Sequence, residues 1–289
     1  MNFINIFRRA ISPIKPTAHH EAERHARRAF KNGFSFSNTV FLVTLVFLFL
    51  PLIVLVIYSF NNSTSMTWTG FSFRWYQRLL TERGLWIAFR NSVIIALTSA
   101  ATATIIGTIG AIGVNWYRFK LRGYVQTISF LPMILPEIII GVSLSIFFAG
   151  IGIPLGLLTI YIAHTTFCLP FVFLMVMARL DEFDFSIIEA AADLGANEKE
   201  TLFKVTLPIC KPGIISGLLT AITLSLEDFV ITFFVSGPGS STLPVFILSA
   251  ITKKGGITPL ISALSVVMIL GTVILTITLR KFLKYIAAK

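Results

Sequence analysis

Six long apolar runs, each free of Lys and Arg, dominate the pattern of hydrophobic and polar positions along the chain. Each run reaches the length of about 20 residues that an α-helix needs to cross a hydrocarbon core. We interpret the first run as a retained span, because it is too long for a signal peptide and no small-residue cleavage site follows it. The six predicted transmembrane helices are residues 38–60, 91–115, 125–149, 153–177, 213–235 and 258–279.

The composition agrees with an integral membrane protein, since 55% of the residues are hydrophobic and 13% are charged. A soluble domain carries about a quarter charged residues. We therefore expect an all-α integral membrane protein. Its predicted domains are a basic cytoplasmic N-terminal tail at 1–37, a six-helix membrane domain at 38–279 and a cytoplasmic C-terminal tail at 280–289.

The 24 Lys and Arg residues predict the orientation, because short cytoplasmic loops retain positive charge. Most of them fall in the two tails and in the loops at 116–124 and 178–212, which lie on one side of the membrane. Both termini are therefore predicted to be cytoplasmic. The net charge of +11 marks helix ends in this interpretation and does not indicate a nucleic-acid partner.

Three histidines of the basic tail, His19, His20 and His25, offer metal or anionic-lipid binding as an alternative to the topogenic role that we expect of this tail. Cys168 and Cys210 have neither disulfide nor metal spacing, and we expect both to be packing residues. No nucleophile with its base stands out, so we expect no catalytic residue, no metal site and no enzyme.

The first outer loop is rich in aromatic residues that alternate with polar ones. Such a segment is typical of the headgroup level of a membrane, and Trp75 to Leu80 is predicted to form a short interfacial helix. Contact with a periplasmic partner is the alternative interpretation.

The cytoplasmic loop at 178–212 carries two consecutive helix-start patterns. Ser186 with Glu189 matches a capping box, and Asn197 with Glu200 repeats it. Gly195 stands where the first helix would end in a left-handed residue. Pro208 and Pro212 are expected to stop the second helix. The small side chains of the first helix favour docking to another protein, while a simple cover for the helix ends is the alternative.

This loop resembles the EAA loop of the permease subunits of binding-protein-dependent ABC importers. That family has EAA, three residues, G, nine residues and I-x-L-P, and this chain departs from it only by Val205 in place of Ile. The resemblance implies a type I importer permease fold in the bacterial plasma (inner) membrane. The matching residues are Glu189, Ala190, Ala191, Gly195, Leu207 and Pro208.

The same resemblance implies that the loop couples the membrane helices to a cytoplasmic ATPase subunit. The sequence has no G-x-x-x-x-G-K-[ST] phosphate loop, so ATP and Mg²⁺ are expected in that partner and no cofactor in this chain. The other implied partners are a second permease subunit, a second copy of the ATPase, a periplasmic or lipid-anchored solute-binding protein, and membrane lipid.

Three carboxylates, Glu137, Glu227 and Asp228, lie near the middle of predicted spans that contain no cationic side chain. Ionised groups at such depth usually face a substrate or ion path, so the three acids favour a positively charged solute. Two alternatives are a proton relay, in which His164 could take part, and hydrogen bonding to hydroxyl groups that holds helices together. The hydroxyl candidates are Ser143, Thr220, Thr223 and Ser225.

A closer resemblance points to the spermidine/putrescine permeases within this family. It covers about residues 41–279, through short motifs that include Leu135-Pro136-Glu137 and Leu224 to Asp228 followed by Ser236-Gly237-Pro238. The resemblance implies polyamine import. A permease for another solute and a proton-coupled secondary transporter are the alternatives.

Overall fold

The computed structural model describes residues 36–64, 67–117, 119–182, 184, 186–253 and 258–287, with side chains up to 274 and at 277–278. It separates the chain into two compact units, residues 1–57 and 58–289. Most of helix α3 (Phe36–Ser59) falls in the first unit. Its apolar side chains are almost all exposed in the isolated chain, as expected for a helix that faces lipid or another subunit.

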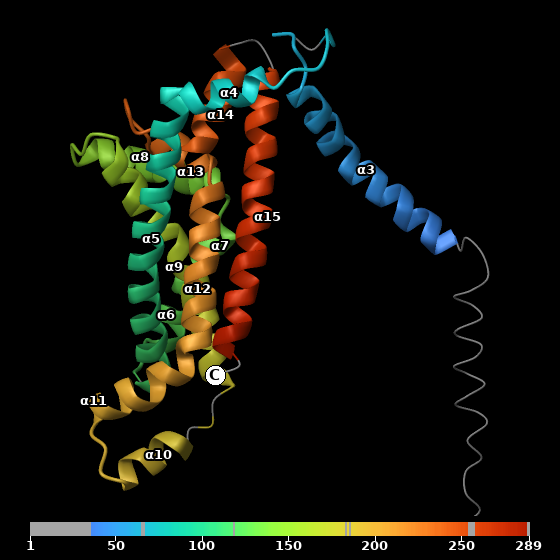
Figure 1. The fold of residues 1–289 in the computed structure, drawn as a ribbon. Helices are drawn as coiled ribbons and strands as arrows, with labels where there is room; N and C mark the ends of the chain where they lie inside the picture. Colours follow the sequence, from blue (N-terminus) through green and yellow to red (C-terminus); the bar gives the residue numbers. More distant parts are fainter. Residues whose placement is uncertain are drawn as a thin grey trace, which may run out of the picture. The chain divides into compact units, whose positions relative to one another are not determined.

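Three long helices form the centre of the second unit: α5 (Arg83–Trp116), α9 (Leu157–Asp181) and α12 (Leu207–Glu227), which all pack against one another (Figure 1). Small residues let their backbones approach closely. Val172 of α9 lies between two glycines. A Cβ added to Gly107 would stand 3.0 Å from the Val172 Cβ, and a Cβ added to Gly217 would stand 3.1 Å from the Val172 Cα. The core of the unit lies at this three-helix contact.

The predicted third span at 125–149 is broken into α6 (Arg122–Ser129), α7 (Leu131–Ile134) and α8 (Glu137–Gly150). The helical direction bends by 104° between the arm at Arg122–Ile134 and the arm at Glu137–Gly150. Pro136 has no N–H to donate and forces Leu135 into an extended conformation with ψ 138°. The sequence carries a signal for this interruption, because Pro132 and Pro136 both lie inside the predicted span.

The predicted fifth span at 213–235 is also divided, which the sequence did not predict. Helix α12 ends at Glu227, Asp228 is extended with ψ 124°, and a short helix α13 (Val230–Val235) follows. Unlike the first break, this one contains neither proline nor glycine, because residues 218–235 have none. Its cause therefore lies in side-chain contacts of the residues around the break.

Four helices in the described part of the chain are long and apolar enough to cross a membrane, and a fifth is added if the bent pair counts as one span. The structure thus agrees with a helical membrane protein. The described apolar part of α15 (Pro259–Ala287) ends at Ile274 and is shorter than a span.

A small cluster closes the end of the second unit that carries α4 (Arg74–Thr81) and α14 (Leu243–Lys253) (Figure 1). The predicted helix at 75–80 is present, but Trp75 is buried against the protein and its indole N–H donates to the Asn61 carbonyl at 2.7 Å. The loop helices α10 (Ser186–Asp193) and α11 (Glu198–Thr201) lie at the opposite end of this unit (Figure 1).

The close approach of α12 to α9 predicts that a side chain at Gly213 destabilises the fold. A Cβ on Gly213 would lie 2.8 Å from the Met175 carbonyl oxygen, and backbone cannot move aside cheaply. We expect Gly213→Ala to destabilise the purified chain by about 1–3 kcal/mol and to lower its apparent Tm in detergent. Gly113→Ala in α5 is the matched control, because nothing lies within 4 Å of its added Cβ. Equal Tm values for the two variants would contradict this packing.

Candidate functional site

Helix α10 begins at Ser186, and its cap is Asp184 rather than the predicted Ser186. The Ser186 N–H donates to Asp184 Oδ1 at 3.0 Å. The predicted capping box at Ser186 is therefore wrong, since Asp184, two positions earlier, supplies the side-chain acceptor. Hydrogen bonds from the backbone N–H and the hydroxyl of Ser186 lower the pKa of Asp184 from its ordinary value of 3.8.

The turn between α10 and α11 matches the sequence prediction. Gly195 has φ +85°, and the Ala196 N–H reaches back to the Ala191 carbonyl at 3.0 Å, which closes the end of α10. The second capping box is confirmed in both directions: the Glu200 N–H donates to Asn197 Oδ1 at 3.0 Å, and the Asn197 N–H donates to Glu200 Oε2 at 3.2 Å.

Pro208 and Pro212 do not stop the second helix, contrary to the prediction. One helical path runs from Glu198 to Glu227, and it contains a π-helical turn at Leu202–Thr206 directly before Pro208. A π-turn widens the helix by one residue. We attribute the passage of Pro208 to this turn, since the wider spacing relieves the clash of the proline ring with the preceding turn.

The residues matched by the EAA pattern lie on this loop with different exposure. Glu189, Ala190, Gly195 and Pro208 are exposed, whereas Ala191 and Leu207 are partly buried. Two large apolar side chains near them also face outward, with Leu194 90% and Phe203 66% exposed. Such exposed apolar groups at a structured loop mark a surface that another protein can cover.

The three predicted carboxylates are at the two helix breaks, but they differ in environment. Glu137 is the first residue of α8 and Glu227 the last residue of α12, and both are exposed. Neither makes a hydrogen bond or an ion pair with another described residue. Asp228 faces the interior, with its side chain 1% exposed.

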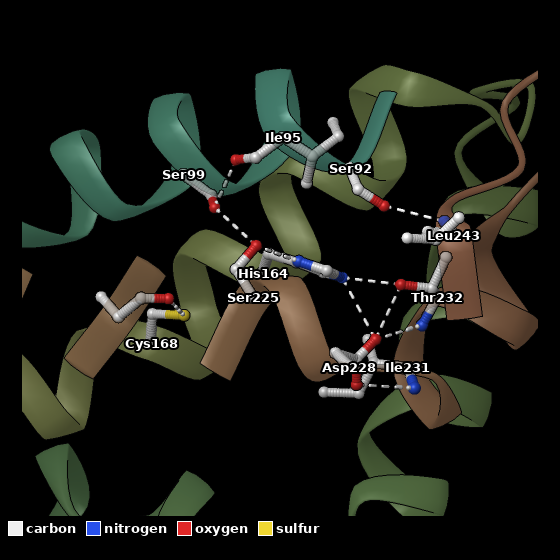
Figure 2. A network of polar contacts seen from close by, with 11 residues as sticks. Ser92, Ile95, Ser99, His164, Cys168, Ser225, Asp228, Ile231, Thr232 and Leu243 are labelled. Atoms are coloured by element: carbon white, nitrogen blue, oxygen red, sulfur yellow. Dashed lines mark hydrogen bonds and ion pairs between the residues drawn. The ribbon is translucent and has the colours of Figure 1, made fainter. Parts of the chain in front are cut away.

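Asp228 is held by four donors (Figure 2). Its Oδ1 accepts from the Ile231 N–H at 3.2 Å, and its Oδ2 accepts from the Thr232 N–H at 2.8 Å and the Thr232 hydroxyl at 2.7 Å. The fourth group is His164 of α9, whose Nε2 lies 3.2 Å from Oδ2. The carboxylate therefore caps α13 and fastens it to α9.

The two breaks lie close to each other because α8 packs against α13. A Cβ on Gly141 of α8 would stand 3.3 Å from the Ile231 Cα and 3.0 Å from the Phe234 ring. Glu137 precedes Gly141 by one helical turn, and Glu227 precedes Ile231 by a similar interval. The fold thus brings into contact the two helices that follow the breaks, although they are distant in the sequence.

His164, which the sequence analysis named only for a possible proton relay, forms hydrogen bonds between helices in the structure. Its partnership with Asp228 and Thr232 was not predicted. The hydroxyl partners proposed for the acids were also different, because Ser225 bonds to His164 and not to a carboxylate. A signal for the network exists in the spacing of Ser225, Asp228 and Thr232, which three- and four-residue steps place on one helical face.

Broken apolar helices with acids at the breaks, together with a structured loop at 178–212, are features of an integral membrane transport component. Comparison with protein families gives a match over residues 103–289 to the family "Binding-protein-dependent transport system inner membrane component". The chain belongs to this family. It is accordingly a transport subunit of the inner membrane and not an enzyme.

Curated relatives cover most of the chain. It is 44% identical over 243 residues to the putrescine transport system permease protein PotI of Escherichia coli (strain K12), which spans 81% of this chain and 85% of that protein. It is 40% identical over 245 residues to the spermidine/putrescine transport system permease protein PotC of Haemophilus influenzae, which spans 84% of this chain and 95% of that protein.

Solved structures with the same fold come from ABC transporters. A chain of a bacterial ABC transporter that imports the acidic polysaccharide alginate superposes with a TM-score of 0.66 at 18% identity, over 87% of this chain and 99% of that one. A chain of the methionine ABC transporter MetNI in an inward-facing conformation gives 0.60 at 21% identity, over 72% and 96%. At such identities the likeness concerns the fold alone.

The Asp184 cap yields a test of α10. We expect Asp184→Ala to speed deuterium uptake by the α10 amides a few-fold at pH 7, because the helix loses its N-terminal acceptor. Since the pKa of Asp184 is lowered on folding, its stabilising effect is present above the ordinary value of 3.8 and is lost as the pH falls through the lowered value. The difference between variant and parent should therefore vanish under strong acid. Asp181→Ala, outside the cap, should match the parent at every pH.

Proposed function

We propose that this chain is a permease subunit of an importer that carries polyamines such as spermidine and putrescine into the cell. The curated relatives support this solute class by their names. The observation that carries the proposal is the pair of exposed acids, Glu137 and Glu227, at adjacent helix breaks without a cationic partner among the described residues. A polyamine supplies the missing positive charges.

The end of α12 adds to this cation-favouring region. Helices leave their last carbonyl oxygens without intrahelical donors, and the partial negative charge there attracts cations. Glu227 stands at that end, and the Asp228 N–H satisfies the Leu224 carbonyl, so the carbonyls of the final residues remain available. An ionised carboxylate at mid-membrane costs roughly 2.5 to 3.5 kcal/mol, which a bound cation offsets. In this proposal Asp228 contributes to the solute path indirectly, by holding α13 in position beside it.

The proposed topology has six spans with both termini in the cytoplasm. The tails are residues 1–37 and 280–289, and the membrane domain is 38–279. Counting the bent pair α6–α8 as one span and α15 as another brings the number of spans to six. The excess of Lys and Arg in the tails and in the loops at 116–124 and 178–212 supports this orientation.

The loop at 178–212 is the proposed contact with the ATPase. Glu189 and Ala190 are exposed on α10 beside the partly buried Ala191, and Leu194 after its end offers an apolar side chain to a groove. A second permease subunit, two ATPase subunits that use ATP and Mg²⁺, and a solute-binding protein outside the membrane complete the proposed assembly. One of the structural neighbours was solved with an alginate pentasaccharide-bound periplasmic protein, an assembly of this kind.

The substrate proposal is tested by ATP-driven uptake of labelled spermidine into proteoliposomes that hold the assembled transporter. We expect Glu227→Gln and Glu137→Gln each to raise the KM for spermidine about tenfold, through the loss of one charge contact in a partly desolvated site. Glu82→Gln, on the connection between α4 and α5, is the control. Putrescine should compete and phosphate should not. Normal KM values in both variants would remove the two acids from the path.

The coupling proposal is tested at Gly195, which has a positive φ that asparagine tolerates and β-branched residues do not. We expect Gly195→Val to abolish spermidine-dependent ATP hydrolysis and uptake, while Gly195→Asn retains most of both. Membrane insertion should be the same for the two variants. ATP-driven uptake of spermidine that survives Gly195→Val would contradict the coupling role, and uptake driven by a proton gradient instead of ATP would identify a secondary transporter.

A further inference from the structure

His164 makes a buried contact on each side of the break between α12 and α13. Its Nδ1 lies 2.7 Å from the Ser225 hydroxyl, in the last turn of α12. Its Nε2 lies 2.8 Å from the Thr232 hydroxyl, in α13. The ring, which is 1% exposed, therefore joins the two segments to α9 at once (Figure 2).

The direction of the hydrogen bonds follows from the partners of Thr232. The Thr232 hydroxyl donates its only proton to Asp228 Oδ2 at 2.7 Å, so towards His164 it can only accept. Nε2 of His164 therefore carries a proton and donates to the pair formed by Thr232 and Asp228. This nitrogen, and not Nδ1, secures α13 and its cap.

Proline, glycine and a π-turn do not cause the break. Kinks in helices arise at proline, at glycine or serine pairs, at π-turns or where a side chain enters the backbone ladder. Residues 218–235 contain no proline or glycine, and α12 has no π-turn near its end. What interrupts the ladder is Asp228, which takes the N–H groups of Ile231 and Thr232 from the carbonyls that a continuous helix would offer them.

We propose that His164 is a positioning residue for transport: through Nε2 it keeps Asp228 and Thr232 in place, holds the break open and so leaves Glu227 accessible at the end of α12. In a continuous helix the next turn, with Val230 and Ile231, would stand over Glu227. The inference rests on the proposed function for its consequence in transport. The geometry of the break is testable without it.

Two substitutions of His164 separate its nitrogens. The amide of glutamine reaches the place of Nε2, whereas that of asparagine reaches only the place of Nδ1. His164→Gln can thus donate to Thr232 and Asp228, and His164→Asn can bond only to Ser225. A difference between them isolates the contact with α13 from the general effect of losing the imidazole.

The first measurement is the labelling rate of Glu227→Cys by a hydrophilic thiol reagent in the assembled transporter. The native Cys168 and Cys210 are buried and give a low background in the parent. We expect His164→Asn to slow labelling at position 227 about tenfold, because a charge-assisted hydrogen bond is worth about that factor, and His164→Gln to stay near the parent rate. Equal rates in all three backgrounds would overturn the inference.

The second measurement is the KM for spermidine with native Glu227. We expect His164→Asn to raise the KM about tenfold and His164→Gln to restore it, with similar amounts of assembled transporter. A residue needed only for folding would instead lower the amount of transporter and leave the KM of the remainder unchanged. If His164→Asn lowers the amount of assembled transporter, Thr232→Val, which removes the acceptor of Nε2, is measured against Thr232→Ser in both assays.

The two arms also separate this inference from the proposed function. Slower labelling in His164→Asn together with a normal KM in Glu227→Gln would uphold the positioning of the break and reject the role of Glu227 in polyamine transport. Unchanged labelling together with a raised KM in Glu227→Gln would reject the positioning and leave the proposed function intact.

Discussion

The structure depends on one constraint: in an apolar surrounding every backbone N–H and C=O needs a partner inside the protein. A break in a membrane helix is therefore possible only where other groups replace the lost bonds. At Pro136 the donor is missing from the start, and the break needs little compensation. At Asp228 the carboxylate itself accepts the N–H groups of α13. The acids beside the breaks are exposed at helix ends: Glu137 is the first residue of α8, and Glu227 is the last residue of α12.

The same constraint explains why Asp228 and Glu227 have different environments despite being neighbours. A buried carboxylate is costly unless several donors surround it, and Asp228 has four. Glu227 has no described partner and stays at the surface of the isolated chain. One acid thus builds the local structure, and the other is free for chemistry at the end of α12. Neighbouring positions at a helix end point in different directions, which makes this division possible.

Much of the fold follows from the sequence, because apolar runs and helix caps are local signals. The runs predicted the long helices, the prolines predicted the break before α8, and Gly195 and Asn197 predicted the turn in the loop. The break at Asp228 was missed, since the sequence assigned this carboxylate to a solute path and not to the backbone N–H groups that it accepts. The passage of the helix through Pro208 was missed because a π-turn has no local signature as clear as a cap. The contact between α8 and α13 was also missed, because it joins segments that are distant in the sequence.

The π-turn before Pro208 has a mechanical consequence. It joins α11 to α12 in one helical path of 30 residues, from Glu198 to Glu227, which turns between α11 and the upper part of α12 (Figure 1). Its first residues belong to the loop at 178–212, and its last residue adjoins the break at Asp228. Because the connection is helical and not an irregular loop, a displacement of α11 reaches α12 through hydrogen-bonded backbone, and the turn between the two helices sets the direction in which α12 is pushed. Had the prolines ended the helix, an irregular and flexible segment would have separated α11 from α12.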